Sequence, residues 1–220
     1  MVKIDTTHKL NSALIGMILF DGSMNGEKYL YIRHGGNQLI YVDEKVKFID
    51  SYLTPKNVRT CVDNKGYTYR YAYYNNERLK NLYKDIYIKG KKQLTKSILN
   101  RFDEITLAIM YMDDGCLGLH KDPKYPGNYK SREIHLNVQS FSLDEVKMLQ
   151  SYLLNKWGID FHLTSDKGKP RLWCNTKNTI KFLEIIAPVI QYNFPSMYYK
   201  LDLKYKAKKI NFLPQNVQLQ

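Results

Sequence analysis

The sequence predicts an α+β fold of two similar halves, each with the element order helix, two strands, helix, two strands, helix. An apolar stretch that ends in aspartate and glycine occurs twice, as "LIGMILFDGS" (14–23) and "LAIMYMDDGC" (107–116). A second repeat follows each of them, "EKVKFIDSYL" (44–53) and "DEVKMLQSYL" (144–153). Because repeats in the same order mark two copies of one structural unit, we expect a pseudo-symmetric pair.

The offset between the copies rises from 93 residues at the first repeat to 100 at the second. The polar, turn-rich segment 120–133 accommodates the extra residues as a longer hairpin loop. We expect an N-terminal half over residues 1–92, a linker over 93–103 and a C-terminal half over 104–220.

The first helix of the N-terminal half is expected to be buried all round, with Thr6 or Thr7 as its N-cap. One face carries apolar residues at helical spacing, namely Leu10, Ala13, Leu14, Met17 and Ile18. The opposite face is also apolar, with Ile15, Gly16, Leu19 and Phe20.

Strand patterns follow in the first half. "KYLYIRH" (28–34) and "NQLIYV" (37–42) are expected to be two strands separated by Gly35 and Gly36. "YTYRYAYY" (67–74) alternates tyrosine with polar, basic or small residues, as a half-buried strand does.

The second half repeats this pattern. "EIHLNVQSF" (133–141) and "PRLWCN" (170–175) are the expected strands. A helix is expected to begin at Ser142 and to end before Gly158, and Asp103 is the expected N-cap of the second apolar helix.

Composition indicates a basic, folded protein. Lys and Arg number 34 against 21 Asp and Glu, a net charge of +13, and there are 19 tyrosines, which favours a polyanionic partner such as nucleic acid. A basic protein from a lysine-rich genome would have the same charge. The 44% hydrophobic content argues against disorder, and three scattered cysteines argue against a disulfide framework or zinc site.

No stretch approaches the roughly 18 apolar residues of a membrane span, and the N-terminus resembles neither a signal nor a transit peptide. We therefore expect no membrane partner. We expect the protein to act where it is made, in an organelle (mitochondrion or chloroplast) or in a bacterial or phage-infected cytoplasm.

Both apolar stretches end in carboxylates, although the C-terminal end of a helix favours cations. Asp114 aligns with Asp21, and each directly precedes a glycine, whereas Asp113 aligns with Phe20 and points about 100° away. If the two apolar helices pack together, Asp21 and Asp114 meet at the boundary of the halves. They would repel each other unless a cation such as Mg²⁺ lies between them. Alternatively, both are ordinary residues of Asp-Gly turns.

The two stretches "LIGMILFDG" and "LAIMYMDDG" resemble the paired LAGLIDADG motifs of homing endonucleases, the single-chain kind with two αββαββα halves packed through their motif helices. The likeness covers about residues 8–203 and is strongest to the monomeric, intron-encoded branch. Two positions depart from the motif and bear on how closely the helices pack: Phe20 stands where a small residue is usual, and Ile109 replaces the motif glycine.

This resemblance implies a monomeric, Mg²⁺-dependent DNA endonuclease that makes a staggered double-strand break in a long target site and so promotes intron mobility. It implies that Asp21 and Asp114 bind the ions, one of them shared, and that the backbone carbonyls of Phe20 and Asp113 complete the ligand shell. Mn²⁺ is expected to substitute for Mg²⁺, and Ca²⁺ to bind without supporting cleavage. Its own intron RNA is a further candidate partner.

The resemblance also implies one lysine in each active site. "KGKKQLTKSIL" offers Lys92, with Lys89 and Lys91 as competing candidates, and "PSMYYK" offers Lys200. Gln139 in "NVQSF" stands where the family has a polar residue near the water network. The alternative for each lysine is a solvated surface charge.

The two sheets are expected to form a saddle in the DNA major groove. The candidate contacts in the first half are Tyr29, Tyr31, Arg33, Gln38, Tyr41, Tyr67, Tyr69, Arg70 and Tyr71. Those in the second half are Lys130, Arg132, His135, Asn137, Lys169 and Arg171. The list covers both faces of one strand, since Tyr67, Tyr69 and Tyr71 share one face and Arg70 lies on the other. Which strand face meets DNA is left open, because a slip of one residue inverts the choice. The alternative is that the tyrosines pack the sheet against its helices.

Two other functions fit the same fold. One is an intron RNA maturase that binds RNA without cutting DNA, and the other is a transcription factor on a LAGLIDADG scaffold. The intact Asp21 and Asp114 favour the nuclease, because neither alternative needs a metal-binding pair.

Overall fold

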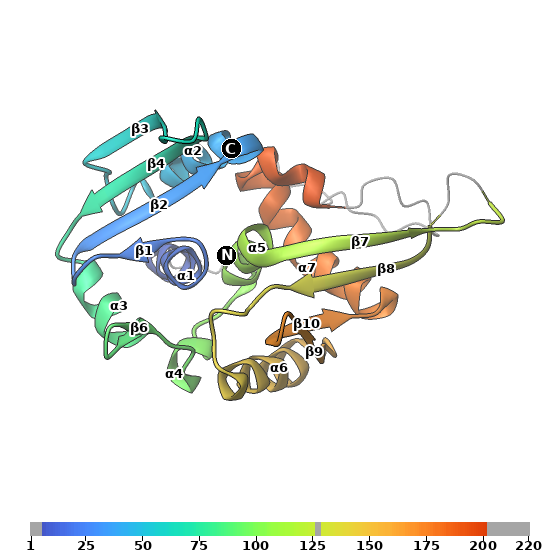
Figure 1. Ribbon diagram of the computed structural model, residues 1–220. Coiled ribbons are helices and arrows are strands. Elements are labelled where there is room, and N and C mark those ends of the chain that lie inside the picture. The colour runs from blue at the N-terminus through green and yellow to red at the C-terminus, as the bar shows by residue number, and fades with distance from the viewer. Residues whose placement is uncertain (1–5, 126–128, 202–220) are drawn as a thin grey trace.

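The computed structural model describes residues 6–125 and 129–201. Two helices, α1 (Thr6–Leu19) and α5 (Glu104–Asp114), lie side by side at its centre, one from each half. An antiparallel sheet lies on either side of this pair (Figure 1). The arrangement confirms the predicted α+β fold of two halves packed through their motif helices.

The first sheet has four antiparallel strands in the order β1-β2-β4-β3. They are β1 (Ser23–Met24), β2 (Tyr29–Gly35), β3 (Asn57–Val62) and β4 (Thr68–Asn75). The helices of this half besides α1 are the 3₁₀ helix η1 (Gly36–Gln38), α2 (Leu39–Ile49) and α3 (Leu79–Ile86).

The second sheet repeats the same order, β7-β8-β10-β9. Its strands are β7 (Gly115–Lys121), β8 (Tyr129–Leu136), β9 (His162–Asp166) and β10 (Lys169–Cys174). The helices are α6 (Leu143–Trp157), α7 (Thr176–Asn193) and the 3₁₀ helix η2 (Pro195–Lys200). Between the halves run a small hairpin, β5 (Tyr87–Ile88) and β6 (Lys91–Lys92), and α4 (Lys96–Leu99), which lies within the predicted linker.

Three predicted helix caps are confirmed. The Asp103 carboxylate accepts from the N–H groups of Ile105 and Thr106 at the start of α5. Ser142 forms a capping box with Glu145, and Gly158 ends α6 with a φ of 61°, a left-handed conformation that glycine adopts without strain. The prediction for Thr6 and Thr7 was wrong, since both lie within α1.

The predicted strand at 37–42 is also wrong, because this segment enters α2. Gly36, with a φ of 58°, turns the chain at the end of β2, so the strand cannot continue. The buried residues of α2 are Tyr41, Val42, Lys45 and Ile49, which follow the spacing of one helix face. The expected strand at 133–141 ends early, at Leu136.

The motif helices are in close contact despite the missing motif glycine in α5. A Cβ atom added at Gly16 would lie 3.0 Å from the Cβ of Ile109, so the Ile109 side chain sits directly on the glycine of the other helix. The Thr106 hydroxyl donates to the Ser12 carbonyl at 3.0 Å, a further bond between the helices. One glycine is therefore enough to allow the close approach.

Gly16→Val is expected to lower the free energy of unfolding by about 2 kcal/mol or more, because two branched side chains cannot share this space without moving the helices apart. Urea unfolding of the wild type and variant measures the cost. The swapped pair Gly16→Val with Ile109→Gly should recover most of it, and an equal loss in the swapped pair would contradict the packing.

None of the helices in the described ranges is both long and apolar enough to cross a membrane.

Candidate active site

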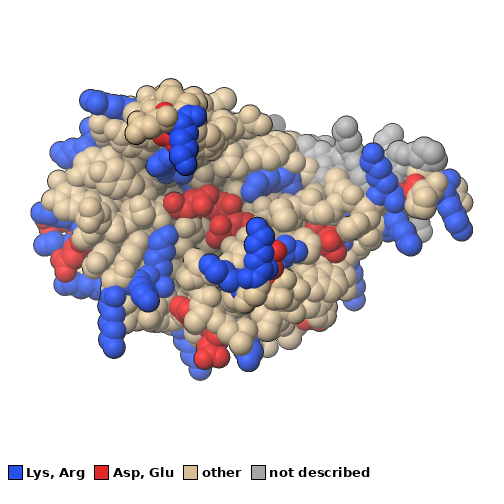
Figure 2. Space-filling view, viewed as in Figure 1, with Lys and Arg blue, Asp and Glu red and all other residues tan. Residues whose placement is uncertain are grey.

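The two motif helices end together at the middle of one face of the molecule. Asp21 lies just beyond the last residue of α1, and Asp114 is the last residue of α5. Figure 2 shows acidic atoms gathered at the centre of this face, with Lys and Arg around them. The helix ends thus hold negative charge inside a basic surface.

The electrostatics of this pair are unfavourable without a cation. Burial, followed by the charges of Asp21 and Asp113, raises the pKa of the Asp114 carboxyl to about 7. Burial also raises the pKa of Asp21, followed by the charge of Asp113. Carboxylates held in this way prefer a proton or a hard cation to ionisation alone. The pair therefore fits a divalent ion by the chemistry of its donors.

Lys92 lies at the C-terminal end of α1. Its ammonium donates to the carbonyls of Leu19 at 3.3 Å, Phe20 at 3.0 Å and Gly22 at 2.6 Å. These carbonyls lie at and just beyond the end of the helix, where cations are favoured. Of the three lysines that competed in the sequence, Lys92 is half-buried at the helix end, whereas Lys89 and Lys91 are exposed.

Lys200 occupies the corresponding position in the second half. Its ammonium donates to the carbonyls of Tyr111, Met112 and Gly115, the last at 3.0 Å. In the repeat, Met112 and Gly115 correspond to Leu19 and Gly22. Burial lowers the pKa of both lysines, and the nearby aspartates act in the opposite direction. The site therefore has one carboxylate and one lysine from each half.

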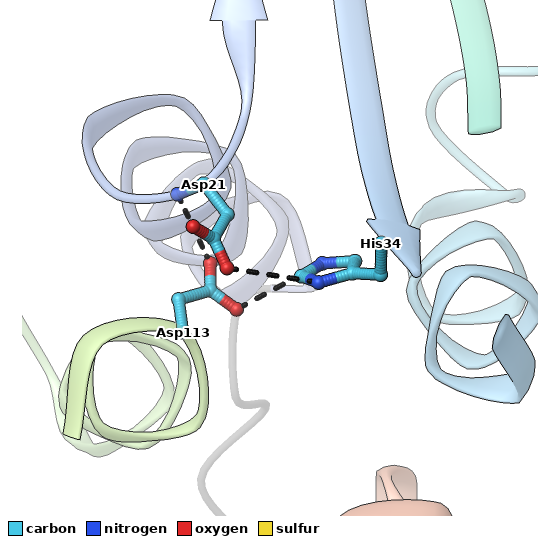
Figure 3. A group of neighbouring side chains, drawn as sticks. All are labelled: Asp21, His34 and Asp113. Carbon is cyan, nitrogen blue, oxygen red and sulfur yellow. Dashed lines mark hydrogen bonds and ion pairs between the residues drawn. The ribbon is translucent and has the colours of Figure 1, made fainter. Parts of the chain in front are cut away.

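Asp113 lies in a different environment, which Figure 3 shows together with Asp21 and His34. The Lys45 ammonium donates to both oxygens of Asp113, at 2.8 and 3.0 Å, and the Tyr41 hydroxyl donates to one of them at 3.0 Å. The side chains of Lys45 and Asp113 are fully buried. Asp113 is thus neutralised by a lysine of the opposite half.

His34 lies between this ion pair and Asp21. Its Nε2 is 2.9 Å from the Lys45 ammonium, which can only donate, so Nε2 accepts and the ring proton is on Nδ1. Nδ1 then donates to the Gln38 side-chain oxygen at 3.2 Å and lies 3.6 Å from a carboxylate oxygen of Asp21. Burial, followed by the charge of Lys45, lowers the pKa of His34 to about 3, so the ring is neutral.

One atom each of Asp21, His34 and Asp113 lies within 4.8 Å of the others, which is a second possible metal site. The Lys45 ammonium, however, already contacts both Asp113 oxygens and the His34 nitrogen. Because a divalent ion would have to displace this buried charge, we consider Asp21 and Asp114 the better donor pair.

The structure places two other predicted site groups, the Phe20 carbonyl and Gln139. The carbonyl of Phe20 faces the Lys92 ammonium. Gln139 is half-buried in the turn between β8 and α6. The carbonyl of Asp113 stays a predicted ligand.

The open face of the first sheet carries five of the predicted DNA contacts. Register pairs Tyr31 with Tyr73 and Arg33 with Tyr71 across β2 and β4, and the alternate residues Ile32 and Ala72 are buried. The predicted contacts on this face are Tyr29, Tyr31, Arg33, Tyr69 and Tyr71. Arg33 lies over the Tyr69 ring at 3.8 Å. A pocket on this face is also lined by Asp21 and Tyr67. The open face of the strands and the end of α1 therefore form one surface.

Three predicted contacts of the first half lie elsewhere. Tyr41 is fully buried in α2. Arg70 faces α2, where it donates to Asp43, and it also donates to Thr60 of the neighbouring strand β3. Gln38 is in η1 and donates to the hydroxyl of Tyr199 at 2.8 Å. The predictions for Gln38 and Tyr41 failed because residues 37–42 were wrongly assigned as a strand. The prediction for Arg70 failed because successive residues of a strand point to opposite faces.

In the second sheet, His135 and Arg171 lie on the open face and contact each other at 2.6 Å. Lys169 has the same strand parity as Arg171 and is exposed. Lys130 is exposed, and Asn137 donates its N–H to the Asp114 carbonyl at 2.8 Å. Arg132 is only 3% exposed, so the prediction that it contacts DNA is wrong; it shares the inward parity of Ile134.

Sequence reasoning missed His34 and Lys45, which both contact the site. A signal was present in the repeat: Lys45 aligns with Glu145, so the charge reverses between the copies. Asp113 likewise aligns with Phe20. Such breaks in a repeat mark positions where the two halves differ in chemistry.

Comparison with known proteins matches residues 11–182 to the family model of the LAGLIDADG DNA endonuclease family. The chain belongs to that family. A curated relative is the probable intron-encoded endonuclease 1 of Wickerhamomyces canadensis, 25% identical over 86% of this chain and 81% of its own length. RecA of Mycolicibacterium flavescens is 28% identical over 89% of this chain, which spans only 47% of that relative.

Solved LAGLIDADG structures share the fold. The homing endonuclease I-WcaI bound to its DNA recognition sequence has a TM-score of 0.71 at 24% identity, covering 88% of this chain and 85% of that chain. I-DmoI in complex with its target DNA in the presence of Mg²⁺ has a TM-score of 0.53 at 15% identity, covering 83% and 98%.

Asp114→Asn is expected to stabilise the metal-free LAGLIDADG protein, most strongly above pH 7. The folded-state pKa of about 7 lies above the ordinary 3.8, so the native state binds more protons between these values and loses stability as the pH rises through them. Asparagine removes this loss, a gain of about 1 kcal/mol or more at high pH. Urea unfolding in EDTA at pH 5.5 and 8.5 measures the difference, and a gain that does not change with pH would contradict the assignment.

Proposed function

We propose that this chain is a site-specific homing endonuclease that cuts both strands of a long duplex to leave staggered ends. In this proposal Mg²⁺ is held by Asp21 and Asp114, and the break promotes mobility of the intron that carries the gene. Family membership supports DNA endonuclease activity in general. One observation supports the specific reaction: the C-terminal end of each motif helix carries one aspartate and binds one lysine ammonium, and the two ends lie together between the sheets.

The two lysines then serve different strands: the Lys200 charge acts more on Asp21, and the Lys92 charge more on Asp114. Lys92 and Lys200 each contact three carbonyls, so either ammonium can exchange one of these for a phosphate oxygen or an attacking water. Their donated bonds would polarise the phosphate or orient the water. A bound Mg²⁺ supplies charge that stabilises the transition state and lowers the pKa of nearby water. No side-chain nucleophile is required.

The duplex would lie along the open faces of the two sheets, with its backbone over the central acidic site. Tyr31 and Arg33 of the first sheet and His135 and Arg171 of the second face this surface. The net charge of +13 favours phosphate contact throughout. Ca²⁺ in place of Mg²⁺ would allow binding to be measured without cleavage, as expected for this family.

DNA affinity is expected to fall steeply with salt, because each neutralised phosphate releases a counterion. The slope of log K against log[salt] should be about −0.9 for each phosphate contacted. Fluorescence anisotropy of a labelled duplex in Ca²⁺, at several NaCl concentrations, measures it. An affinity that does not change with salt would count against this binding surface.

The experiment that tests the proposed function is cleavage of the intronless allele of the host gene, with Mg²⁺ or with EDTA. We expect one double-strand break at a defined site in Mg²⁺ and none in EDTA, with Mn²⁺ able to replace Mg²⁺. Tight binding of intron RNA without any DNA cleavage would favour the maturase instead. The raised pKa of Asp114 supports the nuclease, since RNA binding gains nothing from a buried acidic pair.

A further inference from the structure

The buried cluster around Lys45 uses every donor of its ammonium group. Two donated bonds reach the oxygens of Asp113, and the third reaches Nε2 of His34. The ammonium also lies 4.3 Å from the centre of the Tyr41 ring. Lys45 and Asp113 are both fully buried, so this ion pair is shielded from solvent and has a single geometry.

The cluster joins the two halves at Asp21. Lys45, Tyr41 and His34 belong to the first half, whereas Asp113 ends the motif helix of the second. The backbone N–H of Asp21 donates to Oδ2 of Asp113 at 3.4 Å, the oxygen that also accepts from Lys45 at 3.0 Å. His34 approaches the Asp21 carboxylate at 3.6 Å (Figure 3). Among the described residues, the cluster therefore donates no hydrogen bond to the Asp21 carboxylate, but it accepts one from the Asp21 backbone and packs His34 against the Asp21 side chain.

The repeat identifies the residues of the second half that correspond to this cluster. The offset of 100 residues pairs Tyr41 with Phe141 and Lys45 with Glu145, and the offset of 93 pairs Asp113 with Phe20. Strand register pairs His34 with Val138, because Ser23 faces Tyr31 in the first sheet and its counterpart Cys116 faces His135 in the second.

The counterpart cluster is apolar. The rings of Phe20 and Phe141 meet edge to face, with centroids 6.3 Å apart, and both are buried with Val138. The Glu145 carboxylate is directed elsewhere, to the backbone N–H of Leu94 and of Ser142. In the half that carries Asp114, these positions are thus filled by packed apolar side chains. In the half that carries Asp21, the corresponding positions hold a buried ion pair.

Stability alone does not require the ion pair. Replacing a buried ion pair by well-packed apolar groups is often neutral or stabilising, because the charges lose their hydration on burial. The Phe20–Phe141 contact demonstrates that this fold accommodates the apolar solution. The polar cluster must therefore be explained by what it touches, which is Asp21.

We infer that Lys45 is a positioning residue for the Asp21 side of the site: it holds Asp113 against Asp21, and this one-sided support gives the two DNA strands unequal cleavage rates. The inference rests on the proposed endonuclease function. The inference predicts that the two strands are cut one after the other. One strand is cut faster because the side chains around Asp21 differ from those around Asp114.

The matched variants are Lys45→Met, Lys45→Met with Asp113→Leu, and the control Lys47→Met, which removes the same charge from an exposed position of α2. Lys45→Met alone leaves Asp113 buried and unpaired, so its Tm should fall by about 10 °C. The double variant should recover most of this loss, because both charges are gone. The double variant can then be assayed as a folded protein.

The first readout is the rate at which each strand of a supercoiled plasmid target is cut. The double variant should slow one strand at least about tenfold and accumulate nicked circles. The affected strand should be the one that Lys200→Met slows, because the Lys200 charge acts more strongly on Asp21 than the Lys92 charge does. Lys47→Met should leave both rates unchanged. Equal slowing of both strands, or no change in either, would overturn the inference while the endonuclease activity stands.

The second readout does not depend on cleavage. The double variant leaves the net charge of the cluster unchanged, so a lower affinity for Mn²⁺, measured by electron paramagnetic resonance, reports the position of Asp21. We expect the affinity to fall severalfold in the double variant and not in Lys47→Met. A wild type that binds Mn²⁺ but cuts no DNA would refute the proposed function alone. An unchanged Mn²⁺ affinity in the double variant would refute the positioning role.

Discussion

Replacement of Asp21 or Asp114 by asparagine is expected to abolish cleavage of both strands while binding of the duplex persists. In the proposed mechanism the two carboxylates share an ion, so either change would deprive both strands of the charge that stabilises the transition state. This charge is worth several kcal/mol, or on the order of 10³-fold in rate. Binding should be retained, because removing a negative charge from a basic DNA-binding protein does not weaken its attraction to phosphate.

The measurements are single-turnover cleavage in Mg²⁺ and anisotropy of a labelled duplex in Ca²⁺. Asp113→Asn is the matched control, an identical change one residue away. It should lose far less activity, at most the slowing of one strand expected when the Lys45 pair is lost, since Asp113 is paired with Lys45. If Asp113→Asn were inactive and Asp114→Asn active, the metal ligands would be shifted by one residue.

Lys200→Met is expected to reduce the single-turnover rate at saturating enzyme on the order of 10²-fold or more, as for a positioned acid–base group. A lysine that only contacted phosphate would weaken binding, and a higher enzyme concentration would then restore the rate. The effect should fall mainly on one strand, because Lys200 lies at the end of α5 and Lys92 at the end of α1. Nicked circles should therefore accumulate from a supercoiled plasmid.

Lys92→Met provides the comparison, and it should slow the other strand. Equal slowing of both strands by Lys200→Met, without a nicked intermediate, would remove Lys200 from the catalytic groups. Lys91→Met serves as the control, since Lys91 is the exposed neighbour in β6.

The sequence predicts the fold well because its strongest signals are local or repeated. The two motif stretches and the second repeat establish the pseudo-symmetry, and the caps at Asp103, Ser142 and Gly158 depend on a few neighbouring residues. The alignment of Asp114 with Asp21 also follows from the repeat alone. These features require no knowledge of distant contacts.

The errors arise where a distant contact decides the structure. The segment 37–42 has strand-like composition, yet Tyr41 and Val42 are buried on one face of a helix that packs against the sheet. Arg70 and Arg132 were expected to face DNA as basic residues, but strand alternation turns both inward. Basic character alone does not indicate which face of a strand a residue occupies.

The cluster of Lys45, His34 and Asp113 could not be predicted from helix and strand patterns. Its members are far apart in the sequence, and a buried lysine looks the same as a solvated one until its partner is known. Only a comparison of the two copies, position by position, indicates that the chemistry differs there.

The most direct test of the account is the position of a divalent ion in the protein bound to its target duplex. A crystal of this complex grown with Mn²⁺ would locate the ion by anomalous scattering. The account predicts a peak within ligand distance of carboxylate oxygens of both Asp21 and Asp114, with Lys45 still bound to Asp113. A peak held instead by Asp21, His34 and Asp113, with the Lys45 ammonium displaced, would contradict it.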